Sequence, residues 1–409
     1  TCSDSSNLPL NRRTFLATTS VAAAGLTLLN PKLGFGAETN RKLALGIIGC
    51  GNRGQWITKL FADHGGYEIT AAADYFPDRV NELGGKFNVP AAQRFTGLSG
   101  YKKLLEQKLD AVVIESPPYF HPEQAAAAVD AGKHVYLAKP IAVDVPGCRT
   151  VEASAKKASA SKLCFLVDFQ TRAHPSYQEA VKRVQEGMIG KIVSVDACYH
   201  CGPTWRHMDR ALRKDPKNPE LKLRAWGLDR KLSGDVITEQ NIHAIDVATW
   251  FVDAAPVKAY GTGGVARDLL GDCWDHFQVL YHFPNSVVAS FSSTQVGVGL
   301  DEIQCRARGT EGTADTHYFG EVIVRAQDDI YNGGRLANLY TDGVVNNIAA
   351  FHDAITKGEF SNPTVPPSVR STLTTILGRM AAYQGGEVTW EKMLATDERW
   401  QFDATGLKA

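Results

Sequence analysis

The chain has 409 residues, of which 44% are hydrophobic and 22% are charged, a balance typical of folded globular proteins and unlike that of disordered ones. Its 44 lysines and arginines match its 44 aspartates and glutamates, so no broad basic field is available to hold nucleic acid or an anionic membrane. This length predicts two or three domains, and eight cysteines are too few for a scaffold built on disulfides.

The first 37 residues have the pattern of a targeting segment. The pair Arg12-Arg13 is followed by an uncharged, moderately apolar stretch at 17–29, and small residues end the segment at Ala37. The pattern resembles a twin-arginine export signal and predicts an exported, periplasmic or extracytoplasmic protein. Because a spanning helix takes about 20 apolar residues, we expect no membrane span in the mature protein. A disordered basic N-terminus is the alternative.

The next segment predicts a dinucleotide-binding unit. An apolar run at 42–48 predicts a buried strand, and Gly49-Cys50-Gly51-Asn52-Arg53-Gly54 follows it at once. Residues 55–63 predict an amphipathic helix, and residues 67–73 a second strand that leads to Asp74. Glycines at this spacing also occur by chance, but the strand, the helix and an acid 20 residues after the third glycine together indicate this site.

Each glycine of this turn has a physical role in such a site. Gly49 permits the tight turn, Gly51 lets the backbone approach a pyrophosphate, and Gly54 lets the helix pack close to the strand. The free N–H groups at the helix start, which includes Asn52 and Arg53, favour binding of phosphates. A structural turn that binds no nucleotide is the alternative.

The acid after the second strand predicts which dinucleotide binds. Asp74 is expected to accept hydrogen bonds from both ribose hydroxyls, which favours NAD because the acid would repel a 2′-phosphate. Tyr75 and Arg79 follow closely, and a nearby arginine can accommodate the phosphate of NADP. The cofactor prediction is therefore NAD, with NADP left open.

Two further strands predict the reactive end of the same sheet. The predicted strand 110–114 leads into a proline-rich turn, and the strand 134–137 leads into Ala138-Lys139-Pro140. Ligands of open α/β sheets lie outside the carboxyl ends of the strands. The residues expected there, where a nicotinamide would lie, are Ser116, Pro117, His121 and Lys139.

From about residue 163 the pattern changes to strands separated by turns. The predicted strands are 163–168, 192–198, 257–262, 277–283, 287–294 and 302–308. Few helices intervene, which favours an open, mainly antiparallel sheet. We therefore expect α/β and α+β classes in one chain, with a Rossmann domain at 41–165 and a substrate-binding domain at 166–409.

Residues 233–246 carry the most reactive set of side chains in the second half. If the segment is helical, Glu239 and His243 lie four residues apart on one face, and Asp246 lies three residues further along it. An exposed ion pair is the usual meaning of such a spacing. The preceding loop and the Lys139-Pro140 motif favour a functional meaning instead.

Together these motifs resemble those of the Gfo/Idh/MocA oxidoreductases. The resemblance extends from about residue 42 to the end of the sequence, and it rests on Gly49 to Gly54, Asp74, Pro117 to His121, and Gly132 to Val135 leading to Lys139-Pro140. It implies a nicotinamide cofactor, a small carbohydrate substrate, and a dimer or tetramer that pairs through the open sheet. No nucleic-acid partner is expected.

The chain departs from the family pattern at three positions. Ala138 stands where relatives carry a glutamate, Glu239 where an aspartate is commoner, and Asn241 where a glycine is usual. Lys139 and His243 match the family's motifs, and family members use the histidine as an acid/base.

The resemblance implies an NAD(P)-dependent dehydrogenase for a secondary alcohol of a sugar, glycoside or polyol. His243 would take the hydroxyl proton, with Glu239 fixing its orientation. Lys139 would bond the same oxygen and stabilise the alkoxide charge. The candidate substrate contacts, each of which is as readily structural, are Gln170, Arg172, Trp226 and Asp246.

Two other functions remain open. One is a glycoside hydrolase of the same family, which uses bound NAD for transient oxidation at C3, elimination and return of the hydride. The other is a sugar-binding module without catalysis. Cys198 and Cys201 lack a second ligand pair at metal-binding spacing, and a strand would place them on opposite faces, so no metal site is predicted.

Overall fold

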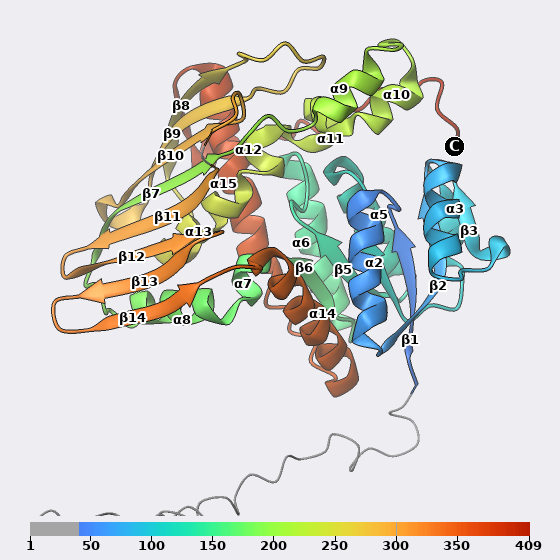
Figure 1. Cartoon of the computed structure of the whole chain (residues 1–409), viewed down its shortest axis with the longest axis horizontal. Helices are drawn as coiled ribbons and strands as arrows, with labels where there is room; N and C mark the ends of the chain where they lie inside the picture. Colours follow the sequence, from blue (N-terminus) through green and yellow to red (C-terminus); the bar gives the residue numbers. More distant parts are fainter. Residues whose placement is uncertain (1–40, 300) are drawn as a thin grey trace, which may run out of the picture. The chain divides into compact units, whose positions relative to one another are not determined.

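The computed structural model describes residues 41–299 and 301–409, and Lys42–Ala409 form one compact unit. The predicted export signal lies outside the described residues. Figure 1 shows two sheets in this unit, a parallel one from the first part of the chain and a larger, mainly antiparallel one from the second. The predicted fold class is confirmed.

The first sheet has six parallel strands in the order β3-β2-β1-β4-β5-β6. Its strands are β1 (Leu43–Ile48), β2 (Tyr67–Asp74), β3 (Arg94–Thr96), β4 (Ala111–Ile114), β5 (His134–Ala138) and β6 (Phe165–Asp168). All four residues of β4 are buried, as expected for a strand covered on both faces. The strand order reverses between β1 and β4, which is where ligands of such sheets bind.

Helices cover both faces of this sheet. The helices of the first half are α2 (Asn52–His64), α3 (Pro77–Lys86), α4 (Gly100–Leu105), α5 (His121–Asp130) and α6 (Val145–Ala160). On one face α2 packs beside α14 (Leu339–Lys357), and Phe61 and Phe351 share a buried cluster with Tyr136 of β5. A helix from the second half of the chain thus completes the first sheet's core.

The second sheet has nine strands in the order β14-β13-β12-β11-β7-β10-β9-β8-β15, and among its pairs only β7 and β10 run parallel within the described residues. Its strands are β7 (Ile192–His200), β8 (Lys258–Gly264), β9 (His276–His282), β10 (Val288–Thr294), β11 (Glu302–Gly309), β12 (Gly312–His317), β13 (Glu321–Ala326), β14 (Ile330–Arg335) and β15 (Glu387–Thr389). The sequence patterns do not predict β12 to β15.

Burial alternates along the strands of this sheet because helices cover one face. In β10 the buried side chains are Ala289, Phe291 and Ser293, at every second position. The helices packed on this face are α8 (Pro175–Gln185), α13 (Ile242–Val252) and α15 (Val365–Gln384).

Short helices connect the larger elements. They are α7 (Gln170–Ala173), α9 (Arg206–Leu212), α10 (Pro219–Arg224), α11 (Arg230–Ser233), α12 (Asp235–Glu239) and α16 (Trp390–Leu394), with 3-10 turns η1 (Ala91–Gln93), η2 (Pro118–Phe120), η3 (Trp226–Leu228) and η4 (Pro284–Ser286). Among the described residues, no helix has the length and apolar character that crossing a membrane requires.

The segment 233–246 does not form one helix. α12 ends at Glu239 and α13 begins at Ile242. Between them the regular bonding is lost, because the N–H of Asn241 donates to a carbonyl five residues back and that of His243 to one three residues back. The expectation that Glu239 and His243 share one helical face is wrong, and this break sends the two side chains to different partners.

Candidate active site

The glycine turn has the shape of a phosphate cradle. A Cβ at Gly49, which has φ +94°, would lie 2.5 Å from the backbone nitrogen of Ser116, and one at Gly54 would lie 1.9 Å from the carbonyl oxygen of Gly49. A Cβ at Gly51 would have Arg79 Nη1 as its nearest described neighbour, at 3.7 Å. The first and third glycines therefore allow close packing, while a Cβ at the second would make only ordinary contact with Arg79, which leaves the backbone approachable as a pyrophosphate requires.

The helix that follows is open to an anion at its N-terminus. Within the described structure α2 has no side-chain cap, so the backbone N–H groups of its first turn are available. Asn52 is exposed in this turn. This donor set suits the phosphates of a dinucleotide.

Asp74 ties the turn to the end of β2. Its carboxylate accepts hydrogen bonds from the backbone N–H of Cys50 at 2.7 Å and of Phe76 at 2.9 Å. Burial raises the pKa of Asp74, against the effect of these bonds and of the Arg79 charge. The Arg79 guanidinium lies 5.0 Å from the centroid of the Phe76 ring, so an acid and a cation both stand where the adenosine ribose is expected.

Arg53 lies in the same turn, but its side chain is directed to the strand ends. Its Nε donates to Glu115 at 2.8 Å, and its two terminal nitrogens donate to Asp168 and to the hydroxyl of Tyr340. The protein's own side chains therefore occupy the guanidinium, and the predicted contact of Arg53 with the cofactor rests on its backbone. Its backbone N–H remains part of the helix start.

The two acids around Arg53 are a buried feature that sequence reasoning missed. The side chains of Glu115 and Asp168 are fully buried at the ends of β4 and β6. Burial raises the pKa of Glu115 to about 7, Arg53 opposes this rise, and Asp168 adds to it. Glu115 Oε1 has no hydrogen-bond partner among the described residues. Their only sequence signal is that each acid directly ends or follows a predicted strand.

His121 is a structural residue of the proline-rich turn. Its side chain is buried, and its ring nitrogens lie 2.7 Å from the carbonyl oxygens of Ser116 and Pro140. Burial lowers the pKa of His121 to about 4, against the effect of the two carbonyl oxygens, which favour the protonated ring. The prediction that this imidazole contacts the cofactor is wrong, because both ring nitrogens face the backbone. Ser116, which donates to Gln124 Oε1 at 2.6 Å, and Pro117 keep the turn beside the cradle.

Lys139 joins the two halves of the molecule. It follows β5 and is 9% exposed. Its Nζ donates to the backbone carbonyl of Glu239 at 2.6 Å and to Glu239 Oε1 at 3.2 Å. The ammonium group of the first sheet is thus fixed by α12, which leads directly into α13.

His243 lies on α13 and is 7% exposed. Its Nδ1 is buried without a hydrogen-bond partner in the described part of the chain. Burial lowers the pKa of His243 well below 6.5, and the charges of Lys139 and Arg53 lower it further. The imidazole is therefore neutral at neutral pH, and the two cations are close enough to oppose its protonation.

The partners of His243 differ from those expected. Glu239 bonds Lys139 rather than the imidazole, so the predicted orienting role of Glu239 on His243 is wrong. The ring instead contacts Tyr318 edge to face, with centroids 5.4 Å apart. Tyr318 is 4% exposed, and no sequence motif singles it out.

Two of the predicted substrate contacts bind each other. Arg172 Nε and Nη2 donate to the Asp246 carboxylate at 2.8 to 3.0 Å, and Ser371 donates to the same carboxylate. Asp246 is fully buried, and the Arg172 guanidinium lies 4.8 Å from the Trp250 ring centroid. The prediction that Asp246 contacts substrate is wrong, because its oxygens are occupied within the core, and Arg172 is its partner there.

The other two predicted substrate contacts are also packed. Gln170 is fully buried and links Asp168, at 3.2 Å, to the Tyr318 hydroxyl, at 3.5 Å, so it supports the wall beside His243. Trp226 packs with Phe76 in an apolar cluster beyond the end of β2. Full burial argues against a substrate contact by Gln170, whereas Trp226 is half-buried and its contact with substrate stays a prediction.

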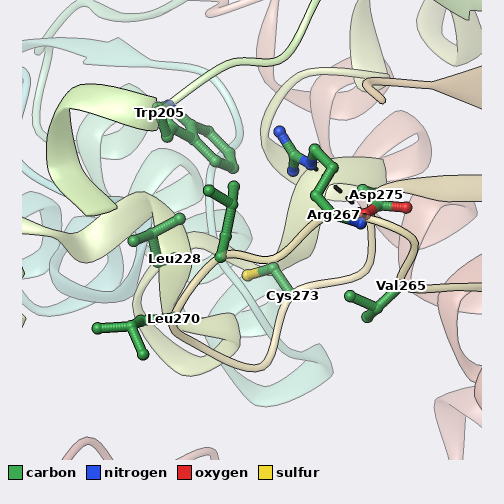
Figure 2. A pocket seen from close by; sticks show the side chains of 8 residues that line it. Trp205, Leu228, Val265, Arg267, Leu270, Cys273 and Asp275 are labelled. Atoms are coloured by element: carbon green, nitrogen blue, oxygen red, sulfur yellow. Dashed lines mark hydrogen bonds and ion pairs between the residues drawn. The ribbon is translucent and has the colours of Figure 1, made fainter. Parts of the chain in front are cut away.

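Figure 2 shows a pocket in the second half, lined by Trp205, Leu228, Val265, Arg267, Leu269, Leu270, Cys273 and Asp275. Arg267 and Asp275 form an ion pair at 3.4 Å across it. Burial lowers the pKa of Arg267. None of the predicted catalytic residues lines this pocket.

The cysteines and metal-ligand residues form no cluster in the described ranges. Residues 41–299 and 301–409 contain no group of three or more side chains suited to hold a metal. Cys198 and Cys201 are free thiols in this part of the chain.

Two family models match the chain on either side of this site. A model for the oxidoreductase family with the NAD-binding Rossmann fold matches residues 43–165, and one for the GFO/IDH/MocA C-terminal domain matches residues 177–315. Together they cover more than half of the sequence. The chain belongs to the Gfo/Idh/MocA oxidoreductase family. Its first sheet is the family's NAD-binding domain.

Individual relatives are distant. Inositol 2-dehydrogenase from Rhizobium meliloti (strain 1021) is 24% identical over 76% of this chain and 88% of its own. A glycosyl hydrolase family 109 protein from Shewanella pealeana is 26% identical over 47% of this chain and 46% of its own. The solved structure of a levoglucosan dehydrogenase in complex with NADH and levoglucosan has a TM-score of 0.70 at 20% identity, covering 85% of this chain and 99% of that one.

Proposed function

We propose that this family member oxidises a secondary alcohol of a sugar, glycoside or polyol, and reduces the corresponding ketone, with NAD(P). The observation that carries the proposal is the junction of Lys139 with α12 and α13. There a nearly buried ammonium group and a neutral imidazole, whose buried Nδ1 has no hydrogen-bond partner among the described residues, lie close enough to interact electrostatically. The similarity to relatives named for inositol and levoglucosan supports the substrate class.

His243 would act as the base. A neutral imidazole accepts the hydroxyl proton as the alcohol is oxidised and returns it to oxygen in the reverse direction. The lowered pKa of His243 keeps the ring in its accepting form throughout the neutral range. The cofactor, when bound, supplies the hydride acceptor.

Lys139 would hold the reacting oxygen. An ammonium group beside that oxygen stabilises the negative charge that develops as the proton leaves. Its two bonds to Glu239 fix the Nζ and leave it one further N–H to donate. Glu239 is thus a positioning residue for Lys139 in this proposal.

Asp74 would select the cofactor. Both of its oxygens accept backbone N–H groups of the turn, and an acid at this position would repel a 2′-phosphate. NAD is therefore the proposed cofactor, while Arg79 beside Gly51 provides the cation that NADP would need.

A second candidate is hydrolysis of a glycoside through transient oxidation at C3. The similarity to the glycosyl hydrolase family 109 protein favours it, although the match covers less than half of each chain. Both reactions need the same base and the same oxyanion partner, so they differ in net outcome and not in the first proton transfer.

One assay separates these functions. Purified protein is incubated with NAD and, in turn, myo-inositol, levoglucosan, and methyl and nitrophenyl glycosides. A dehydrogenase raises nicotinamide absorbance in step with ketone formation, whereas a hydrolase frees the aglycone with no net change in absorbance. A protein that binds one of these sugars and does neither would be a binding module, which would overturn both enzyme proposals.

We also propose export through the twin-arginine segment and assembly into a homodimer or tetramer. The support for export is the sequence pattern around Arg12-Arg13 alone. Replacing both arginines by lysine should leave the protein in the cytoplasmic fraction, and unchanged export of that variant would refute the signal. Light scattering of the purified protein would give the assembly, and a monomer would refute it.

A further inference from the structure

Two segments distant in sequence meet at the end of β2, beside Asp74. They are α10 and residues 400–409, and we call them together the clasp. The hydroxyl of Tyr75, next to Asp74, donates to Glu220 of α10 at 3.0 Å and accepts the backbone N–H of Lys408 at 3.1 Å. In Figure 1 the last residues run past α10 toward α3. One tyrosine thus links both halves of the clasp to the predicted ribose site.

An apolar cluster seals this contact. Its buried members are Phe76, Leu223 and Leu232, and the side chains packed against them are Tyr75, Leu98, Tyr119, Phe120, Trp226, Phe402 and Leu407. The Arg224 guanidinium lies 3.8 Å from the Phe76 ring centroid and pairs with Asp78 at 2.6 Å. The second half of the chain therefore packs against the loop that follows Asp74 and forms an ion pair with the start of α3.

The final segment is held at both of its ends, although residues 395–409 form no helix or strand in the described structure. The Trp400 N–H donates to Asp144 at 2.8 Å, and its ring lies 4.0 Å from the Arg379 guanidinium. At the other end the Leu98 N–H donates to the carbonyl of Lys408 at 3.1 Å. Segments fixed by so few bonds open locally without unfolding the rest of a protein.

We propose that the clasp retains the adenosine half of the bound dinucleotide, so that the enzyme keeps its cofactor from one turnover to the next. This inference rests on the cofactor binding in the proposed function, but not on its substrate or chemistry. Release from Asp74 would require the loop at Tyr75 to part from α10 and from the final segment. The clasp residues that touch this loop, Glu220, Phe402, Leu407 and Lys408, are assigned as cofactor-retaining residues.

The test measures how fast NADH leaves the full-length protein. Protein loaded with NADH is freed of excess ligand by gel filtration and mixed with a large excess of NAD, and loss of nicotinamide fluorescence gives the release rate. A chain ending at Gln401 lacks Phe402 and Leu407 and should release NADH about 10-fold faster, the scale set by losing two partly buried apolar side chains. Tyr75→Phe removes only the hydroxyl and should release it about 2- to 5-fold faster.

Matched variants keep the result interpretable. Arg399→Ala removes an exposed bond to Thr150 just before the clasp and should leave the release rate unchanged. If the shortened chain fails to fold, Phe402→Ala with Leu407→Ala in the full chain replaces it. Release at the full-length rate from a folded clasp variant would overturn the inference, as would the absence of NADH binding. Turnover is not measured, so failure of the proposed chemistry would leave this result standing.

Discussion

The two ends of the dinucleotide site differ in how their polar groups are satisfied. At the β2 end, both oxygens of Asp74 accept backbone N–H groups, and the Tyr75 hydroxyl has two partners. At the β5 end, Glu115 Oε1, His243 Nδ1 and the side-chain amide of Asn241 are buried without partners among the described residues.

This difference indicates that the β2 end holds the cofactor, whereas the β5 end carries the reacting groups. A buried polar atom without a partner costs on the order of 1–3 kcal/mol, so a protein keeps several together only where something offsets the cost. At the β5 end a substrate and a nicotinamide would supply the missing partners. At the β2 end the chain itself supplies the hydrogen-bond partners, and the apolar cluster around Phe76 covers this end of the sheet.

The strongest way to break this comparison is to remove the base. His243→Ala should lower kcat by about 10²–10⁴-fold, the usual contribution of general base catalysis, with little change in NADH binding. Steady-state kinetics on whichever probe sugar reacts would measure it. His282→Ala, at a half-buried histidine of β9 far along the second sheet, is the control and should retain full activity. A His243→Ala enzyme within 3-fold of wild type, a threshold far below the general-base contribution, would exclude the proposed base.

Removing the ammonium group should affect both rate and pH dependence. Lys139→Met should lower kcat/KM by about 10²–10³-fold, the usual loss when an oxyanion partner is removed. Because the Lys139 charge helps to lower the pKa of His243, the same variant should raise that pKa. Wild-type activity should hold down through pH 6.5 and fall only below it, as His243 becomes protonated, and the Lys139→Met profile should fall at higher pH. If the fall in activity at low pH occurs at the same pH in wild type and in Lys139→Met, the Lys139 charge does not act on His243.

A buried ion pair tests the structural assignment of Asp246. Asp246→Asn leaves Arg172 without its bidentate partner and should cost about 3–5 kcal/mol in the free energy of unfolding, measured by urea denaturation. KM for substrate should stay unchanged in the folded fraction. The control is Asp253→Asn, which loses an exposed pair with Arg370 and should cost at most about 1 kcal/mol. A large KM change with native stability would restore Asp246 as a substrate contact.

The smallest expected effect is at the β2 end. Asp74→Ser removes the acid next to the ribose site and should weaken NAD binding about 10-fold, on the scale of one charged hydrogen bond, while NADP binding improves. Fluorescence titration with NADH and NADPH measures both. Asp63→Ser, at an exposed acid of α2 paired with Lys59, should change neither. Unaltered selectivity in Asp74→Ser would assign the choice of cofactor to Arg79 instead.

The sequence predicted what depends on local spacing. The strand, the glycine turn and the helix after it follow one another within a short stretch, and Gly49, Gly51 and Gly54 occupy the positions that their spacing predicts. The antiparallel second sheet followed from predicted strands separated by turns with few helices between them, although β12 to β15 were missed. In β12 and β14 glycine and polar residues interrupt the apolar alternation, which weakens a pattern read on one strand alone.

The predictions that failed concerned side chains whose partners lie far away in the sequence. Spacing placed Glu239 beside His243, but the break at Asn241 leaves Glu239 bonded to Lys139, which lies one hundred positions earlier, at the end of β5. Arg53 lies at its expected place in the glycine turn, yet its side chain forms ion pairs with Glu115 and Asp168 at the ends of β4 and β6. No window of sequence shows which buried acids will face an arginine.

The most direct measurement is a double-mutant cycle on Lys139 and His243, with kcat/KM followed by nicotinamide absorbance. If both side chains act on one oxygen, the double variant should be no more than about 10-fold slower than the slower single variant, because residues that work as a unit give losses that do not multiply. Fully multiplied losses, or near-native rates in either single variant, would show that the ammonium and the imidazole do not serve the same atom.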